Sequence, residues 1–206
     1  MTSKIKNIIQ TKTLLIFDCD GVLFNSGKAN LAYFEKCLKE TLNIPLAGHL
    51  REKATYMSVR QLFQELIENP EEVEEMYRIS QEIPYDPYLP LIKPAFDFER
   101  FLLPLREEKY LAIATNRAKS LVKLFKYFNL FKYFHYKTST CNAAPKPAPD
   151  MLFNCCDYFD VEPADTLFIG DAISDKKAAA GAHITYIHIG TTPDTLCIDS
   201  VPELLK

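Results

Sequence analysis

The segment 14–23 constrains the fold of this chain more than any other. It reads LLIFDCDGVL, and its first four residues have the length and apolar character of a strand buried on both faces of a sheet. Asp18 and Asp20 follow directly, with Gly21 behind them. Open α/β sheets bind ligands at the carboxyl ends of their strands, so the two carboxylates predict a ligand site there. An ordinary Asp-Gly turn is the alternative, and this segment alone does not decide between them.

Chain length and charge limit the classes of protein that fit. With 206 residues, 48% hydrophobic and 25% charged, the chain can form one full domain with a smaller insert, or two small domains. The formal net charge of −3 gives no basic surface for nucleic acid or an anionic membrane. The apolar run before Asp18 fits neither a signal peptide nor a membrane span. We therefore expect neither nucleic acid nor a membrane as a partner.

The cysteines favour a reducing compartment. Six are scattered along the chain, Cys155 and Cys156 are adjacent, and no CxxC pair occurs. This pattern suits reduced thiols better than a disulfide framework or a zinc site. We expect a cytoplasmic protein.

From residue 28 to about residue 83 the sequence predicts helices only. Ser58 is suited to cap one helix, and Asn69 followed by Pro70 predicts the start of another. The glutamates after Pro70 suit a solvated helix face better than a metal site. Apolar residues recur at steps of three and four, as on one face of a helix, at Leu31, Phe34, Leu38 and Leu42 and again at Leu62, Phe63, Leu66 and Ile67.

Two connecting segments bound this helical stretch. Residues 24–27 predict a turn, and residues 84–90 predict an extended linker, because three prolines there remove hydrogen-bond donors and argue against a helix. Two linkers at the ends of one insert predict a hinge. The predicted division is a core of residues 1–24 and 91–206 and an inserted unit of residues 25–90.

The second half of the chain alternates between helix and strand patterns. Short connections between alternating strands and helices imply a parallel sheet with helices on both faces, so we expect an α/β fold. The predicted strands are 110–114, 134–137, 166–169 and 184–189, and the predicted helices are 95–107, 118–128, 150–159 and 176–180.

Polar residues follow two of these predicted strands, as Asp18 and Asp20 follow the strand at 14–17. Thr115 and Asn116 follow one, Asp171 follows another, and Asp175 comes four residues later. Lys146 lies between two prolines just before a helix, a rigid setting that suits a cation held over a bound phosphate. Each residue alone has an ordinary structural explanation, such as a helix cap or a surface charge. Their joint occurrence at strand ends favours a single site.

These segments resemble the motifs of the haloacid dehalogenase (HAD) superfamily of phosphohydrolases, in the forms with a helical cap after the first strand. FDCDGVL at 17–23 looks like the first motif, DxDGxL, and ATN at 114–116 looks like the second. Lys146 in KPAPD looks like the third, and GDAISD at 170–175 looks like the fourth. The resemblance is strongest to the phosphoglycolate phosphatase and β-phosphoglucomutase branch. It implies a Rossmann-like α/β core and an inserted all-helical cap domain.

The resemblance implies a role for each catalytic residue. Asp18 would be the nucleophile that forms an aspartyl-phosphate, and Asp20 the general acid and base. Thr115, the amide of Asn116 and Lys146 would bind the transferring phosphoryl oxygens.

The resemblance also implies a Mg²⁺ site. Asp18, Asp171 and the backbone carbonyl of Asp20 would hold the ion, which prefers oxygen ligands. Asp175 would orient the water ligands of the metal or Lys146. The expected metal site therefore comprises Asp18, Asp20, Asp171 and Asp175.

The retained Asp20 favours phosphoryl transfer over dehalogenation, because the true dehalogenases of this superfamily replace the second carboxylate of the first motif. We expect a Mg²⁺-dependent phosphatase of a small phosphorylated metabolite. A phosphomutase of the β-phosphoglucomutase type stays open as an alternative, as does a non-catalytic module that keeps the fold for binding.

The inserted unit carries the weakest motif signal. Many relatives have a glycine-bearing cap loop, whereas the corresponding residues here, 54–58, include Tyr56 and no glycine. A phosphate ester needs cations, so the candidate cap contacts are Arg51, Lys53 and Arg60, with Arg60 the predicted substrate-binding residue. Phosphoglycolate, a sugar phosphate and a nucleoside monophosphate all stay possible substrates. A monomer or a weak homodimer is expected.

Overall fold

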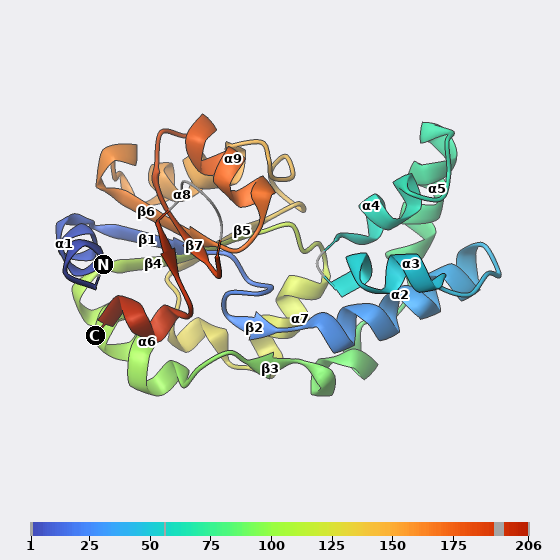
Figure 1. Cartoon of the computed structure of the whole chain (residues 1–206), viewed down its shortest axis with the longest axis horizontal. Helices are drawn as coiled ribbons and strands as arrows, with labels where there is room; N and C mark the ends of the chain where they lie inside the picture. The colour runs from blue at the N-terminus through green and yellow to red at the C-terminus, as the bar shows by residue number, and fades with distance from the viewer. Residues whose placement is uncertain (1, 56, 192–195, 206) are drawn as a thin grey trace.

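A six-stranded parallel sheet is the centre of the computed structural model, which describes residues 2–55, 57–191 and 196–205 (Figure 1). The strand order is β5-β4-β1-β6-β7-β8. All four residues of β1 are buried, and β1 pairs in parallel with both β4 and β6, as its apolar sequence predicts. The strands are β1 (Leu14–Phe17), β4 (Tyr110–Thr115), β5 (Tyr136–Ser139), β6 (Thr166–Gly170), β7 (Thr185–Ile189) and β8 (Cys197–Ile198).

Helices cover both faces of this sheet. Alternate residues of a strand point to opposite faces, so Leu15 and Phe17 belong to one hydrophobic cluster and Leu14 and Ile16 to another. The first cluster includes residues of α1 (Thr2–Thr11), α6 (Phe98–Glu108) and α7 (Ser120–Tyr127), and the second includes residues of α8 (Asp150–Phe159) and α9 (Ile173–Gly181). The predicted α/β class, with helices on both faces, is confirmed.

A separate group of helices lies to one side of the sheet, at the right of Figure 1. The predicted starts of two helices are confirmed: Ser58 and Gln61 form a reciprocal capping box, and Asn69 accepts a hydrogen bond from the Glu71 N–H, with Pro70 at the first helical position. We call this group the helical insert; it comprises α2 (Gly27–Thr41), α3 (Gly48–Arg51), a 3₁₀ turn (Lys53–Thr55), α4 (Val59–Gln64) and α5 (Pro70–Ser80).

The two segments that join the insert to the sheet pair with each other. They form a short antiparallel ladder between β2 (Phe24–Asn25) and β3 (Lys93–Pro94). The prediction of a turn at residues 24–27 is therefore wrong. The turn occupies residues 21–23, where the N–H groups of Leu23 and Phe24 both donate to the Cys19 carbonyl, at 3.1 and 3.0 Å.

The prediction that prolines exclude a helix near residues 84–90 is also wrong. A 3₁₀ helix covers Asp86–Leu91. Its hydrogen bonds use donors that are not proline: Tyr88 N–H bonds to the Tyr85 carbonyl at 3.0 Å, and Ile92 N–H bonds to the Leu89 carbonyl at 3.1 Å. Pro87 stands in the first turn, where no donor is required, whereas Pro90 lies inside the helix and removes one donor that this short helix does without.

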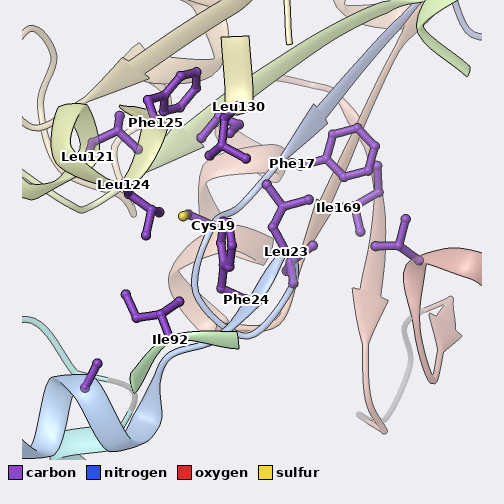
Figure 2. Packing of buried hydrophobic residues seen from close by; sticks show 14 of the residues in the cluster. Phe17, Cys19, Leu23, Phe24, Ile92, Leu121, Leu124, Phe125, Leu130 and Ile169 are labelled. Atoms are coloured by element: carbon purple, nitrogen blue, oxygen red, sulfur yellow. The ribbon is translucent and has the colours of Figure 1, made fainter. Parts of the chain in front are cut away.

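The segment that follows β1 packs its apolar side chains into the hydrophobic core. Figure 2 shows Cys19 and Phe24 lying toward Leu124 and Ile92, and Leu23 lying toward Phe17 and Ile169, all within one buried cluster. Cys19 is fully buried, whereas Asp18 and Asp20 on either side of it line a cleft. The packing of Cys19 therefore anchors the stretch that carries both aspartates.

Other differences from the sequence expectations are small. α1 and β8 have no counterpart in them, and Gly181, expected to end a helix, is its last helical residue, while His183 has the left-handed conformation (φ 57°). The division at residues 24/25 and 90/91 stays a prediction. Among the residues that the structure describes, no helix has both the length and the apolar character that a membrane crossing requires.

Candidate active site

A cleft of about 1720 Å³ lies between the carboxyl edge of the sheet and the helical insert. Arg51 and Lys53 are not among the described residues that line it, and Tyr56 lies outside the described residues. The cleft brings together all eight predicted site residues: Asp18, Asp20, Arg60, Thr115, Asn116, Lys146, Asp171 and Asp175.

The register of the sheet explains how Asp18 meets its distant partners. Phe17 lies opposite Ile113 of β4 and Ile169 of β6. The Asp18 N–H continues the ladder with β6 by donating to the Ile169 carbonyl at 2.8 Å. The residues that follow β4 and β6 therefore emerge on either side of Asp18, as parallel strands require.

Lys146 is the buried cation of the site, with 4% of its surface exposed. Its Nζ lies 2.5 Å from Asp18 Oδ1 and 2.6 Å from Asp175 Oδ1, and it donates to the Ala114 carbonyl at 3.0 Å. Burial opposes its charge, but Asp175 and Asp18 together raise the pKa of Lys146 above its usual value. Lys146 is therefore a fixed positive charge beside the Asp18 carboxylate.

Asn116 fixes the backbone of this lysine. Its side-chain Nδ2 donates to the Lys146 carbonyl at 3.0 Å, and its Oδ1 accepts from the Lys146 N–H at 2.8 Å. The side chain is thereby committed, which leaves any contact of Asn116 with substrate to its backbone N–H. Thr115 is buried, and its hydroxyl accepts from the Arg117 N–H at 3.3 Å.

Asp175 faces inward from the first turn of α9. Its Oδ2 accepts hydrogen bonds from the N–H groups of Asp171 and Ala172, at 3.2 and 3.1 Å, and its Oδ1 pairs with Lys146. These contacts occupy both oxygens of the carboxylate. Asp175 therefore contacts Lys146 and the Asp171 backbone, and its expected role in orienting the lysine or the water ligands of the metal stays a prediction.

Glycine at position 21 allows Asp171 to approach. Gly21 has φ +80°, a conformation that favours glycine, and a Cβ there would overlap the Asp171 carboxylate. The Asp-Gly sequence thus provides both the turn after Asp20 and the space that the Asp171 carboxylate occupies.

Three carboxylates of the described chain could hold a metal ion together. Oxygens of Asp18, Asp171 and Asp175 all lie within 4.8 Å of one another. Burial, and after it the charge of Asp175, raise the pKa of Asp171 to about 7 against a partial decrease from Lys146. Burial likewise raises the pKa of Asp18 well above its usual value, against the opposing charge of Lys146. Crowded oxygen donors with raised pKa values fit a hard divalent cation, which would stabilise their charged forms.

The Asp20 carboxylate is held apart from this cluster. Arg117 donates to both of its oxygens, from Nε to Oδ2 at 2.7 Å and from Nη2 to Oδ1 at 2.6 Å, and the Ser26 hydroxyl also donates to Oδ1. Burial would raise the pKa of Asp20, but the charge and hydrogen bonds of Arg117 and Ser26 lower it overall. Arg117 is a site residue that the motifs do not predict, although its position two residues after Thr115 at a strand end is a usable signal.

Arg60 lines the insert wall of the cleft, but its charge is already paired. Its Nη1 lies 2.5 Å from Glu74 Oε1, and its guanidinium lies over the Tyr77 ring, 4.4 Å from the centroid. A substrate anion would have to share or displace Glu74. The predicted substrate contact of Arg60 stays a prediction.

The fold and the order of the site residues match a known family. The model of the haloacid dehalogenase-like hydrolase family matches residues 15–189. The chain belongs to this family. The matched range includes all the predicted site residues, so the family resemblance inferred from the four sequence motifs is confirmed.

Similar proteins include both members of the predicted branch. A phosphoglycolate phosphatase of Nitrosospira multiformis is 34% identical over 85 residues, which cover 39% of this chain and 37% of that protein. The chain matches only about a third of the length of the first curated relatives, 37% and 33%.

Two solved structures extend the similarity over nearly the whole chain. A putative phosphoglycolate phosphatase from Lactobacillus plantarum has a TM-score of 0.82 and 22% identity, with 94% of this chain and 98% of that chain covered. A putative β-phosphoglucomutase from Thermotoga maritima has a TM-score of 0.68 and 18% identity, with 94% and 96% covered. At these identities the likeness establishes the fold alone.

Proposed function

We propose that this HAD-family protein is a Mg²⁺-dependent phosphatase that hydrolyses a small phosphorylated metabolite through an aspartyl-phosphate on Asp18. One observation carries the proposal: the Asp18 carboxylate lies 2.5 Å from the buried Lys146 ammonium, and its oxygens share a 4.8 Å cluster with those of Asp171 and Asp175. An anionic nucleophile beside a fixed cation suits attack on an anionic phosphate.

In the first step, an oxygen of Asp18 attacks phosphorus. The bond from phosphorus to the leaving oxygen breaks and its electron pair goes to that oxygen. Asp20, which must carry a proton for this step although Arg117 lowers its pKa, gives the oxygen that proton. The products are the free alcohol and an aspartyl-phosphate. Covalent catalysis of this kind divides one difficult displacement into two easier ones.

In the second step, water attacks the same phosphorus. Asp20, now ionised, accepts a proton from the water, and the bond between phosphorus and Asp18 breaks. The cycle releases inorganic phosphate and restores both carboxyl groups. The sum is hydrolysis of one phosphate ester by one water molecule.

Asp18 and Asp171 would hold Mg²⁺, with the Asp20 carbonyl as the third predicted protein ligand. When bound, the ion would neutralise the charge between the nucleophile and the phosphate. Lys146, Thr115 and the Asn116 N–H would bind the phosphoryl oxygens, and Arg60 would approach the leaving group from the insert. We also propose the division into core and cap, a cytoplasmic location, and a monomer or weak homodimer.

The test is phosphate release by the purified protein. The panel contains p-nitrophenyl phosphate, phosphoglycolate, a sugar phosphate and a nucleoside monophosphate, each with Mg²⁺ and each again with EDTA. We expect release from at least one compound with Mg²⁺ and its loss with EDTA. Interconversion of sugar phosphates without phosphate release would indicate a mutase instead. No turnover of any compound would favour a non-catalytic module.

A further inference from the structure

The Arg117 side chain is buried and is held in place by its contacts. Its side chain is 6% exposed, although it carries a full charge and lines the cleft. The guanidinium holds both oxygens of Asp20 in a bidentate contact, and its Cζ lies 5.2 Å from the centre of the Tyr85 ring. Bidentate pairing fixes a carboxylate more strictly than a single contact, because it defines the plane of the group.

The contacts around Asp20 form a closed ring of five side chains. The Ser26 hydroxyl donates to Asp20 Oδ1, and Asn30 Nδ2 lies 3.4 Å from that hydroxyl. The Tyr85 hydroxyl donates to Asn30 Oδ1 at 3.3 Å, and the Tyr85 ring lies beneath Arg117. Ser26 and Asn30 belong to the outgoing side of the insert, and Tyr85 belongs to the returning side. The ring thus joins both connections of the insert to Asp20.

The two carboxylate oxygens of Asp20 have different hydrogen-bond donors in this ring. Oδ1 accepts from Arg117 and from Ser26, whereas Oδ2 accepts, among the described residues, from Nε of Arg117 alone. A carboxylate oxygen accepts about two hydrogen bonds. Oδ2 therefore keeps one position for a proton, and the Asp20 side chain is 29% exposed at the cleft.

We infer that Arg117, supported by the Tyr85 ring, is a positioning residue that fixes Asp20 so that Oδ2 exchanges the proton with the leaving group. This inference rests on the proposed phosphatase function. Arg117 does not touch the reacting atoms in this role. It makes proton transfer to the leaving oxygen depend on the geometry of the insert connections.

The experiment compares two phosphate esters of similar size. The oxygen of p-nitrophenyl phosphate leaves readily as an anion, whereas the oxygen of benzyl phosphate must gain a proton as it leaves. We compare kcat/KM, which covers the steps through phosphoryl transfer to Asp18, for wild type, Arg117→Ala and Arg117→Lys. Circular dichroism and thermal unfolding establish that each variant folds.

For Arg117→Ala we expect kcat/KM to fall about 100-fold with benzyl phosphate and less than about fivefold with p-nitrophenyl phosphate. Arg117→Lys keeps the charge but cannot hold both oxygens, so it should recover only part of the loss. Tyr85→Leu should show the same selectivity at about tenfold, whereas Tyr85→Phe, which keeps the ring, should lose less. Lys119→Ala, which removes a cleft cation paired with Glu82, is the matched control and should change neither ester.

Equal losses with the two esters in Arg117→Ala would overturn the inference, since they would indicate substrate binding or general structural support. Full activity of that variant toward benzyl phosphate would overturn it as well. If Arg117→Ala does not fold, the ratio between the esters in Tyr85→Leu and Arg117→Lys decides the question. Absence of turnover by the wild type would instead contradict the proposed phosphatase function.

Discussion

The Nζ of Lys146 lies 2.5 Å from Oδ1 of Asp18, although 128 residues separate them in the chain. Both groups are almost fully buried, and Asp175 holds the other side of the ammonium at 2.6 Å. Burying an unpaired charge raises the free energy of the folded state, so the stability of this arrangement depends on the ion pairs between Lys146 and the two carboxylates.

Asp18→Asn should remove phosphatase activity without unfolding the protein. Asparagine has nearly the same shape and cannot form the aspartyl-phosphate, so we expect kcat to fall by at least about 10³-fold. Phosphate release and thermal unfolding measure the two effects. Asp157→Asn, an exposed change on α8, is the control and should keep full activity. Retained activity in Asp18→Asn would remove Asp18 from the nucleophile role.

Lys146→Met should destabilise the protein and inactivate it. The change leaves Asp18 and Asp175 buried without their shared cation, so the free energy of unfolding should decrease by about 3 kcal/mol or more. Urea unfolding measures the loss. Adding Asp175→Asn to the same chain removes one of the stranded carboxylates and should restore part of the stability. A single variant as stable as wild type would show that the ion pairs contribute little.

Gly21→Ala should disturb the site through Asp171. The new methyl group would overlap the Asp171 carboxylate, and φ +80° is unfavourable for alanine. We expect a loss of stability of about 1–2 kcal/mol and weaker Mg²⁺ binding, measured by unfolding and by calorimetry. Gly48→Ala is the matched control, because a Cβ at Gly48 has no heavy atom within 4 Å. Equal behaviour of the two variants would contradict the assigned role of Gly21.

The metal-free protein should become less stable as pH rises from about 4 to 7. The pKa of Asp171 is about 7 in the folded protein, above its ordinary value of 3.8, so the folded state binds more protons than the unfolded state in this window. Asp18 acts in the same direction, whereas the lowered pKa of Asp20 acts below this window. The lowered pKa values of His135 and His188 act in the opposite direction and offset part of the decrease. The decrease should be on the order of 1–3 kcal/mol.

Urea unfolding at several pH values with EDTA measures this decrease. Mg²⁺ should reduce it, because bound carboxylates are already ionised. A stability that rises with pH between 4 and 7 in EDTA would mean that the carboxylate cluster is not the source.

Several parts of the fold follow from local sequence signals. The all-apolar stretch of β1 marks a central strand, and the caps at Ser58 and Asn69 begin their helices where predicted. Such signals are readable because they depend on neighbouring residues. The 3₁₀ helix at Asp86–Leu91 was not predicted, because proline lacks an N–H donor and therefore argues against a helix. The hydrogen bonds of this helix are donated by other residues.

Local sequence patterns are enough to identify chemical groups of the site, because Asp18, Lys146 and Asp171 stand in recognisable segments. The pairing of the charged groups in the cleft follows from tertiary packing. The bidentate contact of Arg117 with Asp20 spans 97 residues, and the pairing of Arg60 with Glu74 depends on how α4 packs beside α5. Such contacts follow from the packing of separate elements and from competition among charges, which no local pattern encodes.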